Sequence, residues 1–272
     1  MAGDRSDAQA WEMVDEGWGN KAVDFSTLSE PSNCREYVAL QHLLHVDSGD
    51  LLLDVACGSG LAIELAQLRG AVCSGIDASA RLVAVAELRS PDADIRVGDM
   101  HHLPWEDATF DVATSFRGIW GTTPAAVGEM HRVLKPGGRV GLTVWGHLKM
   151  SPGRWALAPF RLASQSKVEN QAAMVSLGRP GAGEKLLASF GFIDVSRVEV
   201  PFAWEFADPE GFARALASTG PAYEAIQDVG EKAFHDSAVE TAREHLLDGL
   251  PLRAEINVVG YLANKPAEGF HQ

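Results

Sequence analysis

A chain of 272 residues is long enough to bury a full core, as one large domain or as one domain with an insertion. Its 46% hydrophobic and 22% charged residues are typical of a globular protein in water. The formal net charge of −14 argues against a general nucleic-acid binder and against docking on anionic membranes, since both need clustered Lys and Arg. We therefore expect neither nucleic acid nor a membrane as a partner.

The cysteines and the N-terminus bear on the compartment. The three cysteines, Cys34, Cys57 and Cys73, form no C-x-x-C pair and show no zinc spacing, so no metal site is expected. The first residues, MAGDRSDAQAWEMVDEG, are polar and acidic, unlike a signal peptide, and no apolar run approaches the ~20 residues that span a bilayer. These features predict a reduced, cytoplasmic setting.

Strands and helices alternate over the first half of the chain. The expected elements are a short helix within residues 1–20 that carries Trp11 and Trp18, a helix near Ser32–Val46, a strand Leu51–Val55, a helix from about Leu61, a strand Ala71–Asp77, a helix Ala80–Arg89 with Ser79 as N-cap, strands Asp94–Asp99 and Phe110–Ser115, a helix near Pro124–Leu134, a turn Lys135–Gly138 and a strand Arg139–Trp145. This alternation predicts an α/β fold with a mostly parallel, doubly wound sheet and helices on both faces.

The alternation pauses after Gly146. The expected elements there are a largely helical, irregular stretch over 147–180, a helix Glu184–Phe190, a strand of about Ile193–Phe206, a helical stretch Pro209–Leu250, a last strand Ala254–Ala263 and a tail Lys265–Gln272. We expect one domain over residues 1–272, with a core at about 36–146 and 179–264. Cap elements are expected at about 1–35, 147–178 and 207–251.

The stretch LLLDVACGSGLAIEL, residues 51–65, organises the rest of the chain. A run of apolar residues typical of a buried parallel strand ends in a glycine-containing turn, and a helix follows. Glycine lacks Cβ, so such a turn bends tightly and lets a ligand approach the backbone, while the free N–H groups of the next helix face the same space. An ordinary strand-to-helix turn without a ligand is the alternative reading.

Two residues argue against a dinucleotide-binding site at this turn. The G-x-G-x-x-G fingerprint would start at Gly58 and Gly60 and would need glycine where Ile63 stands. Asp54 ends the strand, where a carboxylate would face a pyrophosphate unfavourably. An acid there suits a ligand with an ammonium or sulfonium group, and S-adenosylmethionine (SAM) carries both. An NAD(P)-dependent enzyme is therefore the weakest option.

Four segments in order, LLDVACGSG, GIDAS, VGDMHHLPWEDATFDVATS and EMHRVLKPGGRVGLTVW, make the chain resemble the class I SAM-dependent methyltransferases, in particular the ubiquinone/menaquinone-type small-molecule branch. The resemblance is close over about Leu51–Val144 and looser over Gly178–Ala263. It implies a Rossmann-like sheet with an antiparallel last strand, a helical substrate cap, and SAM as cofactor with S-adenosylhomocysteine as product.

The resemblance also implies roles for individual residues. Asp54, Ala56, Gly58 and Gly60 would hold the methionine end of SAM, although the family usually has glycine where Ala56 stands. Asp77 would accept the two ribose hydroxyls through charge-assisted hydrogen bonds. The remaining expected cofactor contacts are Ala78, Asp99, Met100 and His101 around adenine and Ser115 beneath the methyl donor.

The acceptor is expected to lie above the carboxyl ends of the strands, under cap elements that include Trp18, Arg117 and Trp120. These tryptophans, with Trp155, favour an apolar or aromatic acceptor, or else they form the core of the cap. A small molecule methylated on O, N or C is the leading hypothesis, and the sequence leaves a homodimer open. A protein or RNA methyltransferase and a SAM-binding regulatory or partner protein are the alternatives.

No catalytic residue follows from the sequence. His101, His102 and His147 are the available general bases for an alcohol or carbon nucleophile, and the pattern singles out none of them. Adjacent histidines rarely face one ion, so His101 and His102 do not predict a metal site. Asp77 and Asp99 taken alone could be helix N-caps or solvated strand ends, and only their joint spacing with the glycine turn favours the cofactor roles.

Overall fold

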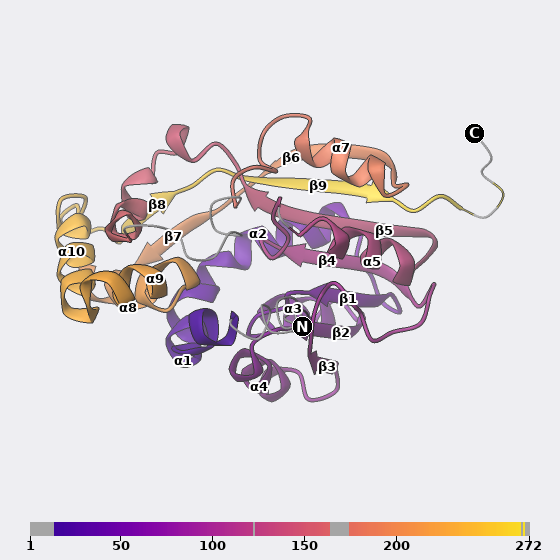
Figure 1. Ribbon diagram of the computed structural model, residues 1–272, viewed down its shortest axis with the longest axis horizontal. Coiled ribbons are helices and arrows are strands. Elements are labelled where there is room, and N and C mark those ends of the chain that lie inside the picture. Colours follow the sequence, from indigo (N-terminus) through magenta and orange to yellow (C-terminus); the bar gives the residue numbers. More distant parts are fainter. Residues whose placement is uncertain (1–13, 122, 164–173, 268, 270–272) are drawn as a thin grey trace, which may run out of the picture.

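The computed structural model describes residues 14–121, 123–163, 174–267 and 269, and its centre is a seven-stranded β-sheet (Figure 1). The strands of this sheet are β1 Leu51–Val55, β2 Val72–Asp77, β3 Asp94–Val97, β4 Phe110–Phe116, β5 Leu134–Trp145, β6 Ile193–Val200 and β9 Val258–Asn264. Their order is β3-β2-β1-β4-β5-β9-β6, and β9 runs antiparallel to both β5 and β6, whereas the other pairs are parallel. This confirms the predicted Rossmann-like sheet with an antiparallel last strand.

Helices cover both faces of the sheet, as predicted. Their bounds are α2 Cys34–Leu43, α3 Leu61–Gln67, α4 Ala80–Arg89, α5 Ala125–Val133 and α7 Ala182–Ser189. Successive side chains of a strand point to opposite faces, so Leu52 packs in the core under α2, α3 and α4, and Leu53 packs in the core under α5 and α7. The predicted N-cap of α4 is confirmed, because the Ser79 hydroxyl accepts from the Leu82 N–H at 3.2 Å.

The order of strands reverses at β1, which lies between β2 and β4. The chain leaves β1 toward β2 and β3 and then returns to place β4 on the other side of β1. Connections that depart in opposite directions leave a crevice at the carboxyl ends of such strands, where ligands of open α/β sheets bind. The glycine turn after β1 lies at this point of the sheet.

A second apolar core, which we call the cap, lies at the carboxyl ends of the parallel strands. Its elements are η5 Arg154–Leu162, β7 Ala203–Phe206, α8 Pro209–Ala217, α9 Gly220–Val229, α10 Glu231–Arg243 and β8 Leu252–Glu255. Figure 1 shows α8, α9 and α10 (orange) at the end of the sheet opposite the β9 arrowhead. Because the parallel strands run against β9, their carboxyl ends point toward the cap.

The N-terminal part of the described chain lies between the sheet and the cap. Residues 15–33, which we call the strap, form four short helical turns. These are η1 Asp15–Gly19, α1 Ala22–Asp24, η2 Phe25–Ser29 and η3 Glu30–Asn33. The first turn contacts α4 on one side and α9 on the other, and η2 contacts α8. Trp11, which the sequence placed in this helical region, lies outside the described residues.

Two long predicted strands are each broken in the structure, so those predictions were wrong in extent. The predicted strand Ile193–Phe206 divides into β6 and β7 around Pro201, and proline cannot donate a hydrogen bond to a strand ladder. The predicted strand Ala254–Ala263 divides into β8 and β9. The freed halves, β7 and β8, pair antiparallel as a separate two-stranded sheet within the cap.

Two further bounds differ from the predictions. The turn predicted at Lys135–Gly138 lies inside β5, which begins at Leu134 and has a register shift against β4 between Phe110 and Val112. Gly137 takes a left-handed φ of +79° there, so the turn residues form an irregularity in the strand rather than a gap before it. The third strand ends at Val97, which leaves Asp99 in the loop that follows.

Among the described residues, no helix combines the length and apolarity that crossing a membrane requires.

The Gly183→Ala variant is expected to lower the free energy of unfolding by about 1–3 kcal/mol in urea denaturation. A Cβ on Gly183 in α7 would lie 2.3 Å from Cζ of Tyr261. That ring is 1% exposed, and its hydroxyl donates to the Leu177 carbonyl at 2.7 Å, so it has no room to move aside. Gly211→Ala in α8 is the control, since its Cβ would meet only Asp208 Oδ1 at 3.4 Å. Equal losses in both variants would contradict this packing.

Candidate functional site

Three carboxylates lie at the carboxyl ends of three neighbouring strands. Asp54 is the last residue but one of β1, Asp77 ends β2, and Asp99 follows β3 by two residues. β2 lies between β1 and β3, and the loop after β3 is tied to β2 because the Gly98 N–H donates to the Asp77 carbonyl at 3.0 Å. The structure therefore brings the three predicted acids to one edge of the sheet, beside the glycine turn.

Asp54 is the most deeply buried of the three acids. The residue is 1% exposed, and its Oδ1 accepts a hydrogen bond from the Thr114 hydroxyl at 2.7 Å. Within the described part of the chain, Oδ2 accepts no hydrogen bond. Burial raises the pKa of Asp54 from 3.8 to about 8, against the hydrogen bond from Thr114, and the charges of Glu30 and Asp77 add to the rise. A cationic group beside Oδ2 would reverse this effect.

Asp77 already binds the backbone of the glycine turn. Its Oδ2 accepts from the Gly58 N–H at 2.8 Å, and its Oδ1 accepts from the Ser79 N–H at 2.9 Å. Burial raises the pKa of Asp77, and these two N–H donors oppose the rise. Each carboxylate oxygen has a second lone pair for a ligand hydroxyl. Ala78, the predicted adenine contact that follows, is half-buried.

Asp99 is held by the two histidines that follow it. The backbone N–H of His101 donates to Asp99 Oδ1 at 2.9 Å, and Nδ1 of the same ring lies 2.6 Å from that oxygen. His102 Nδ1 lies 3.3 Å from Oδ2. Burial raises the pKa of Asp99, but the hydrogen bonds from the histidines outweigh it, so the pKa lies below its ordinary value. Met100 is half-buried against the core under α5, and the predicted adenine contacts of Asp99, Met100 and His101 stay predictions.

The turn between β1 and α3 uses left-handed backbone at three residues. The φ angles are +58° at Ala56, +57° at Gly58 and +81° at Gly60. Glycine is needed at Gly60, because a Cβ there would lie 2.7 Å from the Cβ of Ala86 in α4. The turn is tied to the end of β2, because the Cys57 N–H donates to the Ile76 carbonyl at 3.0 Å and the Gly58 N–H donates to Asp77.

Ser115 adds a polar group without a partner. The residue is 1% exposed near the end of β4, and among the described residues its hydroxyl oxygen has no hydrogen-bond partner. A buried hydroxyl without a partner costs free energy, which a ligand group beside it would recover. Gly118 lies close by, since a Cβ on it would be 3.0 Å from Ser115 Oγ and 2.3 Å from the Cβ of Ala56. The edge beneath the glycine turn is therefore tightly packed.

The strap covers this edge with residues that the sequence did not single out. A Cβ on Gly58 would lie 3.6 Å from Phe25 Cε1 and 3.6 Å from Glu30 Oε1. Glu30 is 1% exposed and pairs with Arg89 of α4, and Asp15 accepts from the Ser79 hydroxyl. The sequence predicted only that residues 1–35 help to cover the site. It did not predict these contacts, because no local pattern marks a single buried acid.

Of the predicted substrate residues, Arg117 is enclosed. Its Nη2 lies 3.0 Å from Glu36 Oε2, its guanidinium carbon lies 4.6 Å from the Trp145 ring centroid and 4.7 Å from that of Phe202, and its side chain is 13% exposed. Arg117 also has a φ of +56°. Its charge is thus matched by a buried carboxylate and two aromatic faces between the sheet and the cap. Trp120 folds back on the same loop and donates from Nε1 to the Arg117 carbonyl at 2.8 Å.

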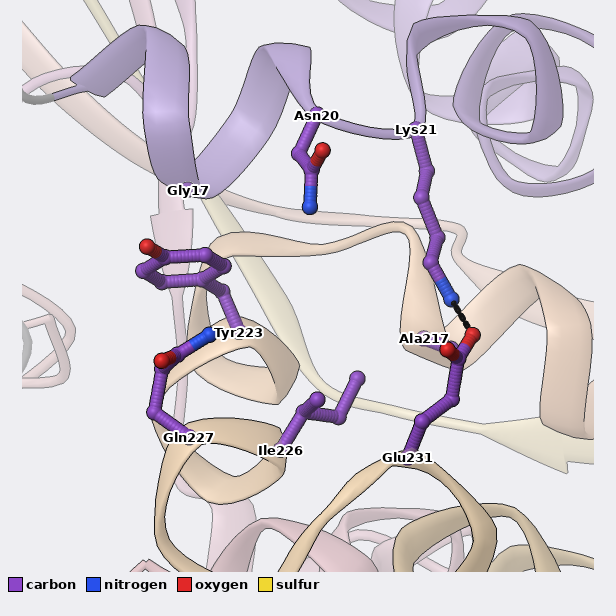
Figure 2. Close-up of a pocket in the computed structure, with 8 residues that line it drawn as sticks. All are labelled: Gly17, Asn20, Lys21, Ala217, Tyr223, Ile226, Gln227 and Glu231. Carbon is purple, nitrogen blue, oxygen red and sulfur yellow. Dashed lines mark hydrogen bonds and ion pairs between the residues drawn. The ribbon is translucent and has the colours of Figure 1, made fainter.

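A cavity of about 180 Å³ lies between the strap and the cap (Figure 2). Figure 2 shows Asn20 and Lys21 of the strap facing α9 and Glu231 across it, with Lys21 Nζ 2.5 Å from Glu231 Oε1. Trp18, the third predicted substrate residue, packs beside this seam. Its Nε1 lies 2.3 Å from where a Cβ on Gly220 would stand. The strap and the cap therefore meet through a partly open, polar contact.

The positions of the histidines and of Trp155 identify no general base and no further substrate contact. The side chain of His102 is 86% exposed and His147 is exposed, while His101 is paired with Asp99. Trp155 stacks on His245 with centroids 4.4 Å apart and packs against Phe212, so it belongs to the core of the cap. Among the described residues, no cluster of three or more His, Cys, Asp or Glu could hold a metal ion.

Comparisons with known proteins agree on one family. Residues 53–142 match the family model described as "Methyltransferase domain". A demethylmenaquinone methyltransferase from Renibacterium salmoninarum is 30% identical over 46% of this chain and 54% of its own length. A ubiquinone/menaquinone biosynthesis C-methyltransferase from Rubrivivax gelatinosus is 29% identical over 73% of this chain and 70% of its own length. The chain spans about half the length, or less, of the first curated relatives that it matches.

Solved structures share the fold at low sequence identity. The [4+2]-cyclase SpnF matches 86% of this chain and 81% of its own, at 23% identity and a TM-score of 0.57. Phosphoethanolamine N-methyltransferase 2 from Haemonchus contortus, solved with S-adenosyl-L-methionine, matches 96% of this chain and 61% of its own, at 17% identity and a TM-score of 0.59. These likenesses confirm the fold class that the sequence predicted.

Proposed function

Because the chain belongs to the class I SAM-dependent methyltransferases of the small-molecule type, we propose that it transfers a methyl group from SAM to a small-molecule acceptor. The observation that carries this proposal is the placement of Asp54, Asp77 and Asp99 at the ends of adjacent strands, around a turn in left-handed backbone. The order of these acids along the sheet matches the order of the cationic, ribose and adenine parts of SAM.

Each acid has a distinct task in the proposed site. Asp54 Oδ2 accepts a hydrogen bond from the ammonium group, and the turn at Ala56, Gly58 and Gly60 holds the rest of the methionine end. Asp77 accepts from the two ribose hydroxyls while it keeps the Gly58 N–H, which fixes the nucleoside relative to the turn. The adenine ring is held by Ala78, Asp99, Met100 and His101, and the Ser115 hydroxyl gains the partner that it lacks.

When bound, SAM supplies a methyl carbon that its sulfonium sulfur makes electrophilic. The chain's own residues then need only to hold the acceptor in line and to exclude water. Phe25 and Glu30 pack against Gly58 of the turn, which serves the second requirement. Trp18, Arg117 and Trp120 border the space toward the cap, and we propose that they contact the acceptor. The nucleophile is an O, N or C atom of that acceptor, and we assign no general base.

Three further points accompany this proposal. We retain the division of one domain over 1–272 into a core at about 36–146 and 179–264 and cap elements at about 1–35, 147–178 and 207–251. A cytoplasmic location is supported by the three cysteines, which are free thiols. A homodimer is supported by the exposed side chains of Leu246, Leu247 and Leu250, which are 41%, 64% and 57% exposed.

Methyl transfer is tested with SAM labelled on its methyl group and a panel of small acceptors that includes demethylmenaquinol, phenols and amines. We expect label in one acceptor class with the wild-type chain, and much less label at the same SAM concentration with an Asp77→Asn variant. Binding of SAM without transfer to any acceptor would favour a SAM-binding regulatory protein instead. Absence of SAM binding would overturn the proposed function as a whole.

A further inference from the structure

A buried ion pair joins the strap to the glycine turn. Glu30 in the strap accepts hydrogen bonds from the Ser59 hydroxyl, from Arg89 Nη1 and, at 3.5 Å, from the Leu61 N–H that begins α3. Arg89, on α4, donates in addition to the Ser59 carbonyl at 3.0 Å and to the Ser26 carbonyl of the strap at 2.7 Å. The two side chains together therefore bind the turn, the start of α3 and the strap at once.

We propose that Glu30, held by Arg89, is a positioning residue that keeps the glycine turn in the shape that binds the methionine end of SAM. This inference rests on the proposed function, because it assigns that turn to the cofactor. Glu30 touches neither the ribose acid nor the adenine residues, and its contacts go to Ser59 and Leu61. Its effect should accordingly be confined to the amino-acid end of the cofactor.

The turn needs support from outside its own residues. Left-handed backbone costs free energy for a residue with a Cβ, and Ala56 adopts it at a φ of +58°. The Gly58 N–H is fixed by Asp77 on the side of β2. On the other side the fixing groups are Glu30 and Arg89, which hold the hydroxyl and the carbonyl of Ser59. Loss of Glu30 would free the Ser59 hydroxyl and leave Arg89, which holds the Ser59 carbonyl, without its carboxylate partner.

The burial of the pair makes the coupling strong. The side chain of Glu30 is 1% exposed and that of Arg89 is 20% exposed. Burial raises the pKa of Glu30, which the hydrogen bonds from Ser59 and Arg89 oppose. Removing one member of such a pair leaves a buried charge without its partner, so the surrounding backbone is expected to rearrange. Arg89 also holds the Ser26 carbonyl, so a shift of Arg89 would move the strap as well as the turn.

Two ligands separate this role from general destabilisation. S-adenosylhomocysteine carries the amino-acid end, whereas 5′-methylthioadenosine is the same nucleoside thioether without it. Isothermal titration calorimetry of Glu30→Gln should show Kd for S-adenosylhomocysteine raised by about tenfold or more, with Kd for 5′-methylthioadenosine changed less than threefold. Glu30→Asp is a second variant that keeps the charge, and it should recover part of the lost affinity.

Asp24→Asn is the matched control. Asp24 is also a strap carboxylate, and it pairs at 2.6 Å with Arg214 of α8 rather than with the turn. This variant should bind both ligands as the wild type does. Equal weakening of both ligands by Glu30→Gln, or no weakening of either, would overturn the positioning role while leaving the methyltransferase proposal intact. A wild-type chain that binds neither ligand would overturn the proposed function and this inference with it.

Discussion

The Asp77→Asn variant is expected to bind SAM about 100-fold more weakly than the wild type in isothermal titration calorimetry. A carboxylate can accept from both ribose hydroxyls, whereas the amide of Asn offers one acceptor oxygen and turns donor hydrogens toward the second hydroxyl. The loss of charge-assisted hydrogen bonds amounts to about 3 kcal/mol, which corresponds to this change in Kd. The same substitution also disturbs the turn, because Asp77 holds the N–H groups of Gly58 and Ser79.

Asp236→Asn serves as the control for that measurement. Asp236 is an exposed acid on α10 that pairs with Lys232, far in the chain from the glycine turn. Its substitution removes the same charge and should leave SAM affinity unchanged. Urea denaturation of the Asp77 variant without ligand reports how far the turn itself is loosened. A Kd within threefold of the wild type would show that Asp77 does not bind the ribose.

The sequence predicted the parts of the site that are built from local patterns. A strand, a glycine turn and a helix fall within residues 51–65, and their spacing alone identifies Asp54, Gly58 and Gly60 as one unit. The alternation of strands and helices then predicts the parallel sheet, so Asp77 and Asp99 come to the same edge as Asp54. The structure confirms this fold, and the cofactor roles of these residues remain predictions.

The strap contacts could not be predicted in the same way. Glu30 and Arg89 are 59 residues apart, and Asp15 and Ser79 are 64 residues apart, so no periodicity connects them. An acid beside Pro31 in a polar stretch is usually exposed, and only the folded chain shows that Glu30 is buried. The strap is made of short π-, α- and 3₁₀-helical turns, whose irregular spacing gives no clear apolar stripe.

Arg117 illustrates a different limit. The sequence placed it in the loop after β4, facing the acceptor, and that role stays a prediction. Its partners in the structure come from distant parts of the chain. Glu36 lies in α2, Trp145 ends β5 and Phe202 lies between β6 and β7. Since the charge of Arg117 is matched inside the protein, we expect it to shape the acceptor space through its aromatic neighbours rather than as a free cation.

The binding of SAM is expected to release about one proton at pH 7, and Asp54 is expected to be its source. Without ligand the pKa of Asp54 is about 8, so the carboxyl is mainly protonated at pH 7. A cationic ammonium beside Oδ2 favours the charged form and lowers this pKa well below 7, so the bound carboxyl is almost fully ionised. The affinity for SAM should therefore rise as the pH increases from 6 to 8 and level off above. Calorimetry at one pH in phosphate and in Tris measures the released proton, because the two buffers differ in ionisation enthalpy.

Asp54→Asn tests the same group in the absence of SAM. The pKa of Asp54 is 3.8 when unfolded and about 8 when folded, so the folded state holds the extra proton between these values. Its contribution to stability is full below pH 4 and is lost as the pH rises to 8. Asn does not titrate, so at pH 8 the SAM-free variant should exceed the wild type in unfolding free energy by on the order of 5 kcal/mol more than at pH 4. The variant should also bind SAM weakly and without the proton release.

Two outcomes would show that Asp54 does not carry the released proton: a wild type whose enthalpy of SAM binding is the same in both buffers, or a variant that releases the same proton. The burial of this acid would then serve the fold rather than the cofactor.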